Sequence, residues 1–331
     1  MNGLSNRLKV YWRLARPFTL LPPLLGMVSG AITALGAAAA AHGQGVGEWL
    51  GHEGYTPIGF ILIGAFVAAA LNAGSNAVNQ WTDLANDRIN KPHRPIPSGQ
   101  VTIPEALCVG AVFYLAAIGA AWFIRPFGAD PRFLVRNQCF LIVIAGALFT
   151  LIYSVPAFGR TKRWAWPAQL TISIPRGCLL KVAGWSCVAT VVSDLEPWYI
   201  GSIFFLFLLG ASATKDFADM EGDRAAGCAT LPVRYGPKSA AYQIAPFFVV
   251  PWLLIPLGLV VTKSTGERML TGSPALLLIL GVVLVAYGLF TVRLILRDPD
   301  ELARNENHPS WGHMYKMMML AQLGLALAYL V

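Results

Sequence analysis

Long apolar stretches alternate with short polar ones along almost the whole chain. Nine of the apolar stretches approach the roughly 20 residues that an α-helix needs to cross the hydrocarbon core of a bilayer. The pattern predicts an all-α membrane protein whose nine transmembrane helices form one bundle around a central cavity, with residues 1–331 as a single integral-membrane domain. The predicted spans are 17–39, 57–82, 103–125, 138–155, 167–192, 198–218, 239–261, 273–295 and 311–331.

Polar positions inside the second span form a regular series. Asn72, Asn76, Asn79, Asp83 and Asp87 follow one another at intervals of three or four residues, which places them on one face of a helix. Amides on such a face often join membrane helices by hydrogen bonds, and this interpretation stays open for the stripe taken alone. The two aspartates that continue it favour a ligand site.

A second acidic cluster repeats the first. Asp216, Asp219 and Asp223 close the sixth span, and the last two follow Asp83 and Asp87 at the same offset of 136 residues. Within each pair the carboxylates are one helical turn apart. Unpaired charge at a membrane boundary is costly, so we expect these carboxylates to have a cationic partner.

Composition and charge agree with a membrane protein. Hydrophobic residues make up 56% of the 331 positions and charged residues 13%, whereas soluble domains have about 25% charged residues. Of the Lys and Arg residues in the termini and loops, 17 lie on the side of the N-terminus and five on the other side. The positive-inside rule therefore places the N-terminus, both acidic clusters and the cavity mouth in the cytoplasm, with bilayer lipids around the bundle and a bacterial or archaeal cell membrane as the expected location. The net charge of +8 follows from this topology, and no nucleic-acid partner is expected.

The chemistry of the clusters points to a metal and a phosphate group. Carboxylates and amides without His or Cys favour Mg²⁺, which prefers oxygen ligands and shares them with substrate phosphates. Acids for a metal and bases for phosphate oxygens together indicate a diphosphate site, although each basic residue alone is explained equally well as a topology signal. The turn-rich segments 90–99 and 227–236 are candidate lids over it. The neighbouring basic residues are Arg88, Lys91, Arg94, Arg160, Lys162, Arg163, Lys215 and Arg224.

Two cations fall inside the fifth predicted span. Arg176 and Lys181 are expected to face a cavity or a counter-charge, because a cation inside a membrane is otherwise costly. A salt bridge to one of the motif aspartates is one interpretation. The other is that Arg176 anchors an anionic or carbonyl-bearing acceptor, or completes the clamp on the diphosphate.

These residues together resemble the UbiA superfamily of intramembrane prenyltransferases. The resemblance covers nearly the whole chain and rests on two long motifs, N-x-x-x-D-x-x-x-D-x-I-N-K-P-x-R-P-I-P-S-G from Asn79 and K-D-x-x-D-x-E-G-D-x-x-x-G-x-x-T-L-P from Lys215. Arg16-Pro17, Tyr153-Ser154 and Lys162-Arg163 also match. Gln80 departs from the Asp of many members and is shared with those that act on homogentisate, while the residues from Arg94 to Gly99 resemble the branch of chlorophyll synthases and geranylgeranylglyceryl-phosphate geranylgeranyltransferases.

The resemblance implies an activity and assigns residues to it. The implied reaction is Mg²⁺-dependent transfer of a polyprenyl group, of about geranylgeranyl size, from its diphosphate to a hydrophobic acceptor that is lipid-biosynthetic or ring-bearing, through an allylic cation. The implied metal ligands are Asp83, Asp87, Asp216, Asp219 and Asp223, of which Asp83, Asp87, Asp219 and Asp223 are the catalytic set. The diphosphate would contact Asn79, Arg88, Arg94, Lys162, Arg176 and Lys215. The acceptor would lie near Arg176, Lys181 and Tyr153.

Three alternatives remain open at this point. The acceptor could be 4-hydroxybenzoate, as in quinone biosynthesis, or absent, as in a membrane terpene cyclase that uses the same cation chemistry. A cation-coupled lipid transporter belongs to a different class, and its expected mark is helices broken near the bilayer centre in both repeats. The acids here lie at helix ends on one side, which favours an enzyme.

Overall fold

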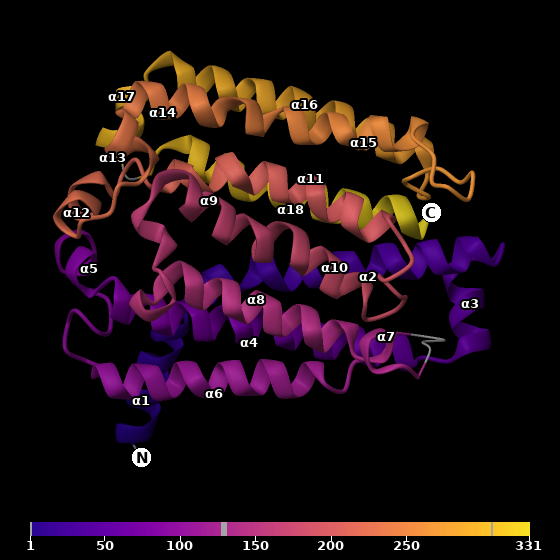
Figure 1. Cartoon of the computed structure of the whole chain (residues 1–331), viewed down its shortest axis with the longest axis horizontal. Helices are drawn as coiled ribbons and strands as arrows, with labels where there is room; N and C mark the ends of the chain where they lie inside the picture. Colours follow the sequence, from indigo (N-terminus) through magenta and orange to yellow (C-terminus); the bar gives the residue numbers. More distant parts are fainter. Residues whose placement is uncertain (1, 127–130, 306) are drawn as a thin grey trace.

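The computed structural model describes residues 2–126, 131–305 and 307–331, and the regular elements within these ranges are all helices (Figure 1). Six short elements interrupt or join the α-helices, of which η4 is a π-helix and the others are 3₁₀-helices. In chain order the elements are α1 (Asn2–Ala15), η1 (Pro17–Leu20), α2 (Leu21–Ala41), α3 (Val46–Glu53), α4 (Thr56–Thr82), α5 (Leu84–Asn90), α6 (Ile103–Ala121), α7 (Phe133–Arg136), α8 (Gln138–Ser154), η2 (Pro156–Phe158), η3 (Thr161–Arg163), α9 (Ala165–Ser173), η4 (Ile174–Leu179), α10 (Leu180–Trp185), α11 (Glu196–Ala211), η5 (Ser212–Lys215), α12 (Met220–Ala225), α13 (Leu231–Tyr235), α14 (Pro237–Ile244), η6 (Ala245–Phe248), α15 (Val250–Val260), α16 (Pro274–Arg297), α17 (Pro299–Arg304) and α18 (Pro309–Leu330).

The long helices lie side by side in one bundle (Figure 1). Helix α4 packs against α2 and α6, and α2 packs against α10 and α18. The short helices α5 and α12, which carry Asp87 and Asp223 of the two acidic motifs, lie together at one end of the bundle, while α3, α7 and the C-terminus lie at the other end. The predicted all-α fold is confirmed, and both acidic motifs share one end of it.

The described helices differ in whether they are long and apolar enough to cross a membrane. Among the described residues, six helical segments are long and apolar enough to cross a membrane: Pro17–Ala41, Thr56–Thr82, Ile103–Ala121, Glu196–Lys215, Pro237–Val260 and Pro274–Arg297. These six indicate an integral membrane protein. The other three predicted spans are also helical, but α8 has only 17 residues, α9 to α10 are interrupted by η4, and α18 carries His313, Lys316 and Gln322. The count of nine and the cytoplasmic orientation therefore stay predictions.

The interruption at η4 has a local cause. Pro175 has no backbone N–H to donate within the helix, and its ring displaces the preceding turn, so the backbone widens to the π form over Ile174–Leu179. Arg176 follows directly and lies in this widened turn. The helix then continues as α10 and ends at Trp185, earlier than the predicted end at residue 192.

Glycines allow the helices around the site to approach closely. A Cβ built on Gly30 of α2 would lie 2.7 Å from the Lys181 carbonyl oxygen of α10, and one on Gly184 would meet the Met27 carbonyl oxygen of α2. Small residues at such crossings let two helix backbones come together, which is how helices pack in a membrane. The close pairing of α2 with α10 fixes the wall from which Arg176 projects.

Candidate active site

A cavity of about 230 Å³ lies inside the bundle, at the end where α5 and α12 meet. Its wall is formed by parts of the chain that are far apart in the sequence, from the segment after α1 to the middle of α18. All five predicted metal ligands line it, namely Asp83, Asp87, Asp216, Asp219 and Asp223. Six cations line it as well, namely Arg16, Lys91, Arg94, Lys162, Arg176 and Lys215. The cavity therefore combines acids and bases as the sequence predicted.

The first motif is placed by the break between α4 and α5. Helix α4 ends at Thr82, and Asp83 is the residue between it and α5, whose first turn carries Asp87. Asp83 forms an ion pair with Lys162, the last lysine before α9. Arg94 Nη1 donates to both carboxylate oxygens of Asp87 at 2.7 Å. Each acid of this motif is thus paired with a cation from a loop.

The second motif repeats this arrangement between η5 and α12. Lys91 Nζ donates to the two oxygens of Asp219 at 2.6 and 2.8 Å. Asp216 accepts a hydrogen bond of 3.0 Å from Gln169 Nε2. Asp223 accepts hydrogen bonds from Asn86 Nδ2 at 2.5 Å and from Thr230 Oγ1 at 3.2 Å. Asn86 and Lys91 of the first motif thus bind acids of the second.

Burial changes the pKa of several charged groups around the cavity. Burial, together with the charge of Asp219, raises the pKa of Asp223 to about 7. Burial also raises the pKa of Asp87, although Arg94 opposes the shift. Burial likewise lowers the pKa of Lys162, although Asp83 opposes that change. A divalent cation among these acids would relieve the cost of keeping them ionised.

The donor set fits Mg²⁺ in kind, and the aspartates are each bound to protein groups in this structure. Asp83, Asp87 and Asp219 bind cations, and Asp223 binds neutral donors. Within the described part of the chain, no three His, Cys, Asp or Glu side chains are gathered closely enough to hold one metal ion. The acids nevertheless face one cavity with oxygen atoms only, which suits a hard cation that also takes oxygens from a bound phosphate. The metal assignment stays a prediction on this basis.

Other predicted site residues fall inside the cavity wall or outside it. Asn79 lines the cavity, and its Oδ1 accepts hydrogen bonds from Ser154 Oγ at 3.1 Å and Lys162 Nζ at 3.3 Å. Tyr153 lines it as well. Arg88 does not line the cavity and is exposed on the outer side of α5. The structure gives no support to a diphosphate contact at Arg88.

The two cations of the fifth predicted span have separate surroundings. Arg176 lines the cavity, and its Nη2 donates to Asn72 Oδ1 at 3.2 Å. Lys181 is buried between α2 and α10 outside the cavity wall, where its Nζ donates to Ser29 Oγ and lies 4.2 Å from the centre of the Phe204 ring. Neither forms the salt bridge to a motif aspartate that was one interpretation of the sequence. In this structure Lys181 joins helices and does not face the site.

The polar side chains in and just after α4 have two different roles. Asn76 Nδ2 donates to the Ala15 carbonyl oxygen at 2.8 Å, and Gln80 Nε2 donates to that of Leu14 at 2.9 Å. Their targets are carbonyl groups at the end of α1, which have no partner within that helix. Gln80 is buried and outside the cavity wall, so its place in the motif serves the junction after α1. Asn79, Asp83 and Asp87 have the other role, which is to line the cavity.

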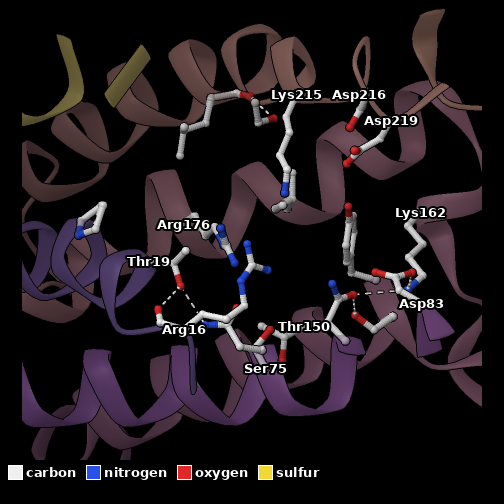
Figure 2. A pocket seen from close by; sticks show the side chains of 18 of the residues that line it. Arg16, Thr19, Ser75, Asp83, Thr150, Lys162, Arg176, Lys215, Asp216 and Asp219 are labelled. Carbon is white, nitrogen blue, oxygen red and sulfur yellow. Dashed lines mark hydrogen bonds and ion pairs between the residues drawn. The ribbon is translucent and has the colours of Figure 1, made fainter. Parts of the chain in front are cut away.

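Two of these cations had no specific role in the predicted site: Arg16, and Lys91, which was named only among the basic residues next to the acids. Arg16 follows α1 with a left-handed backbone (φ 56°, ψ 68°), and its side chain points into the cavity (Figure 2). Lys91 binds Asp219 in the cavity wall. Both belong to segments singled out above, the Arg-Pro pair and the N-K-P-x-R-P run. Their proximity to the acids depends on chain segments that are distant in sequence, so the pattern alone could not show it.

Comparison with known proteins agrees with this architecture. Residues 45–308 match the sequence model of the UbiA prenyltransferase family. The bacteriochlorophyll synthase 33 kDa chain of Cereibacter sphaeroides is 28% identical over 290 residues, covering 86% of this chain and 82% of that protein. The digeranylgeranylglyceryl phosphate synthase of Methanosphaera stadtmanae is 26% identical, covering 60% and 65%. The structure of a UbiA homologue from Archaeoglobus fulgidus bound to DMAPP and Mg²⁺ shares the fold, with a TM-score of 0.65 and 19% identity over 96% of this chain and 99% of that one.

Proposed function

Because the chain belongs to the UbiA prenyltransferase family, we propose that it transfers a polyprenyl group of about geranylgeranyl size from its diphosphate to a lipid-biosynthetic or ring-bearing acceptor. The observation that carries the proposal is the single cavity lined by five aspartates from two motifs and by six cations. The relatives named for bacteriochlorophyll and digeranylgeranylglyceryl phosphate synthesis support an acceptor of this kind. The homologue bound to DMAPP and Mg²⁺ supports a prenyl diphosphate donor.

The proposed metal ligands are the five aspartates of the cavity wall. They supply only oxygen atoms and face one another from α5 and the segment leading into α12. Mg²⁺ bound there would neutralise charge on the diphosphate as it departs. The rest of the proposed mechanism concerns what the side chains of this chain do.

The cations of the cavity wall would hold the diphosphate. Lys162, Arg94 and Lys91 are now bound to aspartates, and each would exchange its carboxylate for a phosphate oxygen when a metal takes over that carboxylate. Lys215 lines the cavity close to Asp216 and Asp219 (Figure 2) and would add a fourth positive charge. Positive charge aimed at the leaving group stabilises it most as the bond breaks.

The reaction then needs water to be kept out. The bond between C1 of the prenyl chain and the diphosphate oxygen breaks, and its electron pair leaves with the diphosphate. An acceptor atom forms the new bond to C1 with its own electron pair and releases a proton. Tyr153, in the wall beside the acids, would present its ring to the allylic cation. Segments 90–99 and 227–236, next to α5 and α12, would exclude water from it as lids.

Replacing single aspartates tests the metal assignment. Asp83→Asn and Asp219→Asn should each lower the rate of prenyl transfer at least about a thousandfold, because a positioned metal supplies several kcal/mol of stabilisation in the transition state. Both proteins should remain folded, since these carboxylates line a cavity and are not packed in the core. Activity within threefold of wild type in either variant, or activity in excess EDTA, would contradict the assignment.

Product analysis tests the reaction class. The purified protein is incubated with geranylgeranyl diphosphate and a panel of acceptors, including chlorophyllide, geranylgeranylglyceryl phosphate, homogentisate and 4-hydroxybenzoate. Prenylation of one of the first three supports the proposal. Prenylation of 4-hydroxybenzoate alone would identify a quinone-type enzyme, a cyclised hydrocarbon would identify a terpene cyclase, and unchanged donor would argue for transport.

A further inference from the structure

The six cations of the cavity wall fall into two groups. Lys91, Arg94 and Lys162 each form an ion pair with an aspartate. Arg16, Arg176 and Lys215 line the same cavity, and within the ranges that the structure describes none of the three forms an ion pair with a carboxylate. Lys215 lies close to Asp216 and Asp219 (Figure 2), so Arg16 and Arg176 are the two cations that remain. A cation that faces a cavity inside a membrane protein without a protein counter-charge points to an anion from outside the chain.

A network of hydrogen bonds from α4 holds these two arginines in one place. Asn72 Nδ2 donates to the Thr19 carbonyl oxygen at 2.9 Å, and Asn72 Oδ1 accepts from Arg176 Nη2 at 3.2 Å. Asn76 binds Thr19 Oγ1 at 2.8 Å and also the carbonyl oxygen directly before Arg16. The amides thus tie the turn that carries Arg16 to the π-helix that carries Arg176, and Figure 2 shows both guanidinium groups pointing into the same part of the cavity.

Holding the two guanidinium groups together is unfavourable without an anion. Burial lowers the pKa of Arg16 to about 10, and the positive charges of Arg94 and Arg176 add to the shift. Guanidinium groups bind carboxylate and phosphate oxygens in pairs of parallel hydrogen bonds, so two of them side by side match one anionic group well. The hydroxyl groups of Ser75 and Thr150 lie near them in the wall (Figure 2), where Thr150 Oγ1 is already bonded to the Ala147 carbonyl oxygen and to the Tyr114 hydroxyl.

The pair lies away from Asp83, although Arg94, the partner of Asp87, is near enough for its charge to lower the pKa of Arg16. In Figure 2 the guanidinium groups lie to one side of the site, while Asp83 and its partner Lys162 lie to the other. The wall also includes apolar side chains from α2, α10 and α18, such as Pro22, Leu180 and Met318. An amphiphilic molecule could therefore place its anionic group on the arginines and its apolar body against these helices.

We propose that Arg16 and Arg176 form a second anion subsite, which binds the phosphate monoester or carboxylate of an amphiphilic acceptor while the donor diphosphate binds at the acid motifs. This inference rests on the proposed function, since it identifies the class of acceptor. It gives Arg16 and Arg176 a role in binding the acceptor, and it gives Asn72 the role of positioning Arg176.

Binding without donor and without Mg²⁺ tests the subsite directly. The protein is placed in phosphatidylcholine nanodiscs, and dodecyl phosphate, dodecanoate and dodecanol are titrated while tryptophan fluorescence is followed, to which Trp311 in the cavity wall contributes. At least one of the two anionic probes should bind about tenfold more tightly than dodecanol, which corresponds to one charge-assisted contact. The comparison of phosphate with carboxylate identifies which anion the acceptor carries.

The variants are chosen to remove charge without disturbing the fold. Arg16→Gln and Arg176→Gln should each weaken binding of the anionic probe about tenfold. Arg176→Lys keeps the positive charge and should retain most of the affinity for the anionic probe. This variant can still be compared with wild type if Arg176→Gln does not fold. Arg297→Gln, at the exposed end of α16, is the control and should bind the probe as wild type does. Unchanged affinity in both Gln variants would overturn the proposal.

Competition distinguishes the subsite from the diphosphate site and from a lipid site. Saturating Mg²⁺ and pyrophosphate should leave the probe bound, whereas displacement would assign both arginines to the diphosphate clamp. Nanodiscs containing phosphatidylglycerol should not abolish probe binding, because loss of binding there would mean that the site takes a bilayer headgroup. None of these measurements needs catalysis, so a failure of prenyl transfer contradicts the proposed function and leaves the binding result to decide the subsite separately.

Discussion

Lys91 binds both carboxylate oxygens of Asp219, 128 positions further along the chain, and so joins the segments that follow the two acidic motifs. The contact is reinforced where α5 meets α12. Asn90 Nδ2 lies 3.4 Å from the Asp219 carbonyl oxygen, and a Cβ on Gly222 would collide with the Asn90 side chain. The junction between α5 and α12 thus depends on a few polar contacts around one ion pair.

Lys91→Gln should loosen this junction. The variant loses the charge-assisted bonds to Asp219, worth about 1.5–3 kcal/mol, so local opening of residues 84–91 should become at least about tenfold more frequent. Amide hydrogen exchange of this segment measures the change, with Lys238→Gln, an exposed lysine at the start of α14, as the control.

Adding Mg²⁺ and a diphosphate analogue to the wild type should slow exchange in 90–99 and 227–236, and equal exchange with and without them would argue that these segments are not lids.

Gln80→Leu tests the junction after α1. The substitution leaves the Leu14 carbonyl group without its partner in a buried place, which should lower the free energy of unfolding by about 1–3 kcal/mol. Activity should fall as well, because Arg16 lies two residues further along. Gln100→Leu, at an exposed position where Gln100 Oε1 accepts a hydrogen bond from Arg13, should cost less than about 1 kcal/mol. Denaturation followed by circular dichroism gives the stability, and a Gln80→Leu variant as stable as wild type would contradict this role.

Glu196 holds the opposite end of the bundle together. Its buried carboxylate accepts hydrogen bonds from Lys263 Nζ at 2.9 Å, from the Thr271 backbone N–H at 2.7 Å and from the Tyr329 hydroxyl. Glu196→Gln removes the buried charge that pairs with Lys263, which keeps Asp194 as a second partner at 3.1 Å, and should cost about 1.5–3 kcal/mol of stability. Asp298→Asn breaks an exposed pair with Arg304 and should cost less than about 1 kcal/mol. Thermal denaturation of the two variants provides the comparison, and similar midpoints would contradict the difference.

The pH dependence of this cluster has a definite sign. Burial by itself would lower the pKa of Lys263, but the hydrogen bond and charge of Glu196 outweigh it and raise the pKa above the usual value. Since the folded state holds this proton more tightly than the unfolded state, the stabilisation is complete at neutral pH and is lost as the pH rises through the raised pKa. In Glu196→Gln the loss of stability at alkaline pH should therefore be smaller than in wild type.

Reporter fusions test the orientation. A reporter inserted within 91–100 or 225–238 should report the cytoplasm, and one within 42–54 should report the opposite side, because the basic residues gather on the side of the acidic motifs. The reversed pattern would place the cavity mouth outside the cell. That result would contradict a donor taken from the cytosol.

The sequence by itself determined the membrane bundle and the shared end of the two motifs. Apolar length and the helical period are local properties of the chain, so they predict helices directly. The offset between the Asp83 and Asp219 motifs, with an even number of crossings between them, then places both at one end. The choice of oxygen ligands for a metal also follows from residue types alone.

Only the tertiary structure decided which side chains meet. Lys162 reaches Asp83 across 79 positions, and Arg16 enters the cavity because Asn76 and Gln80 bind the carbonyl groups before it. Arg88 was assigned to the site because it follows Asp87, yet successive side chains on a helix point about 100° apart, and Arg88 faces outward. Lys181 likewise shares a span with Arg176 and faces another helix. Such pairings depend on helix rotation and on contacts between distant segments, which residue spacing does not contain.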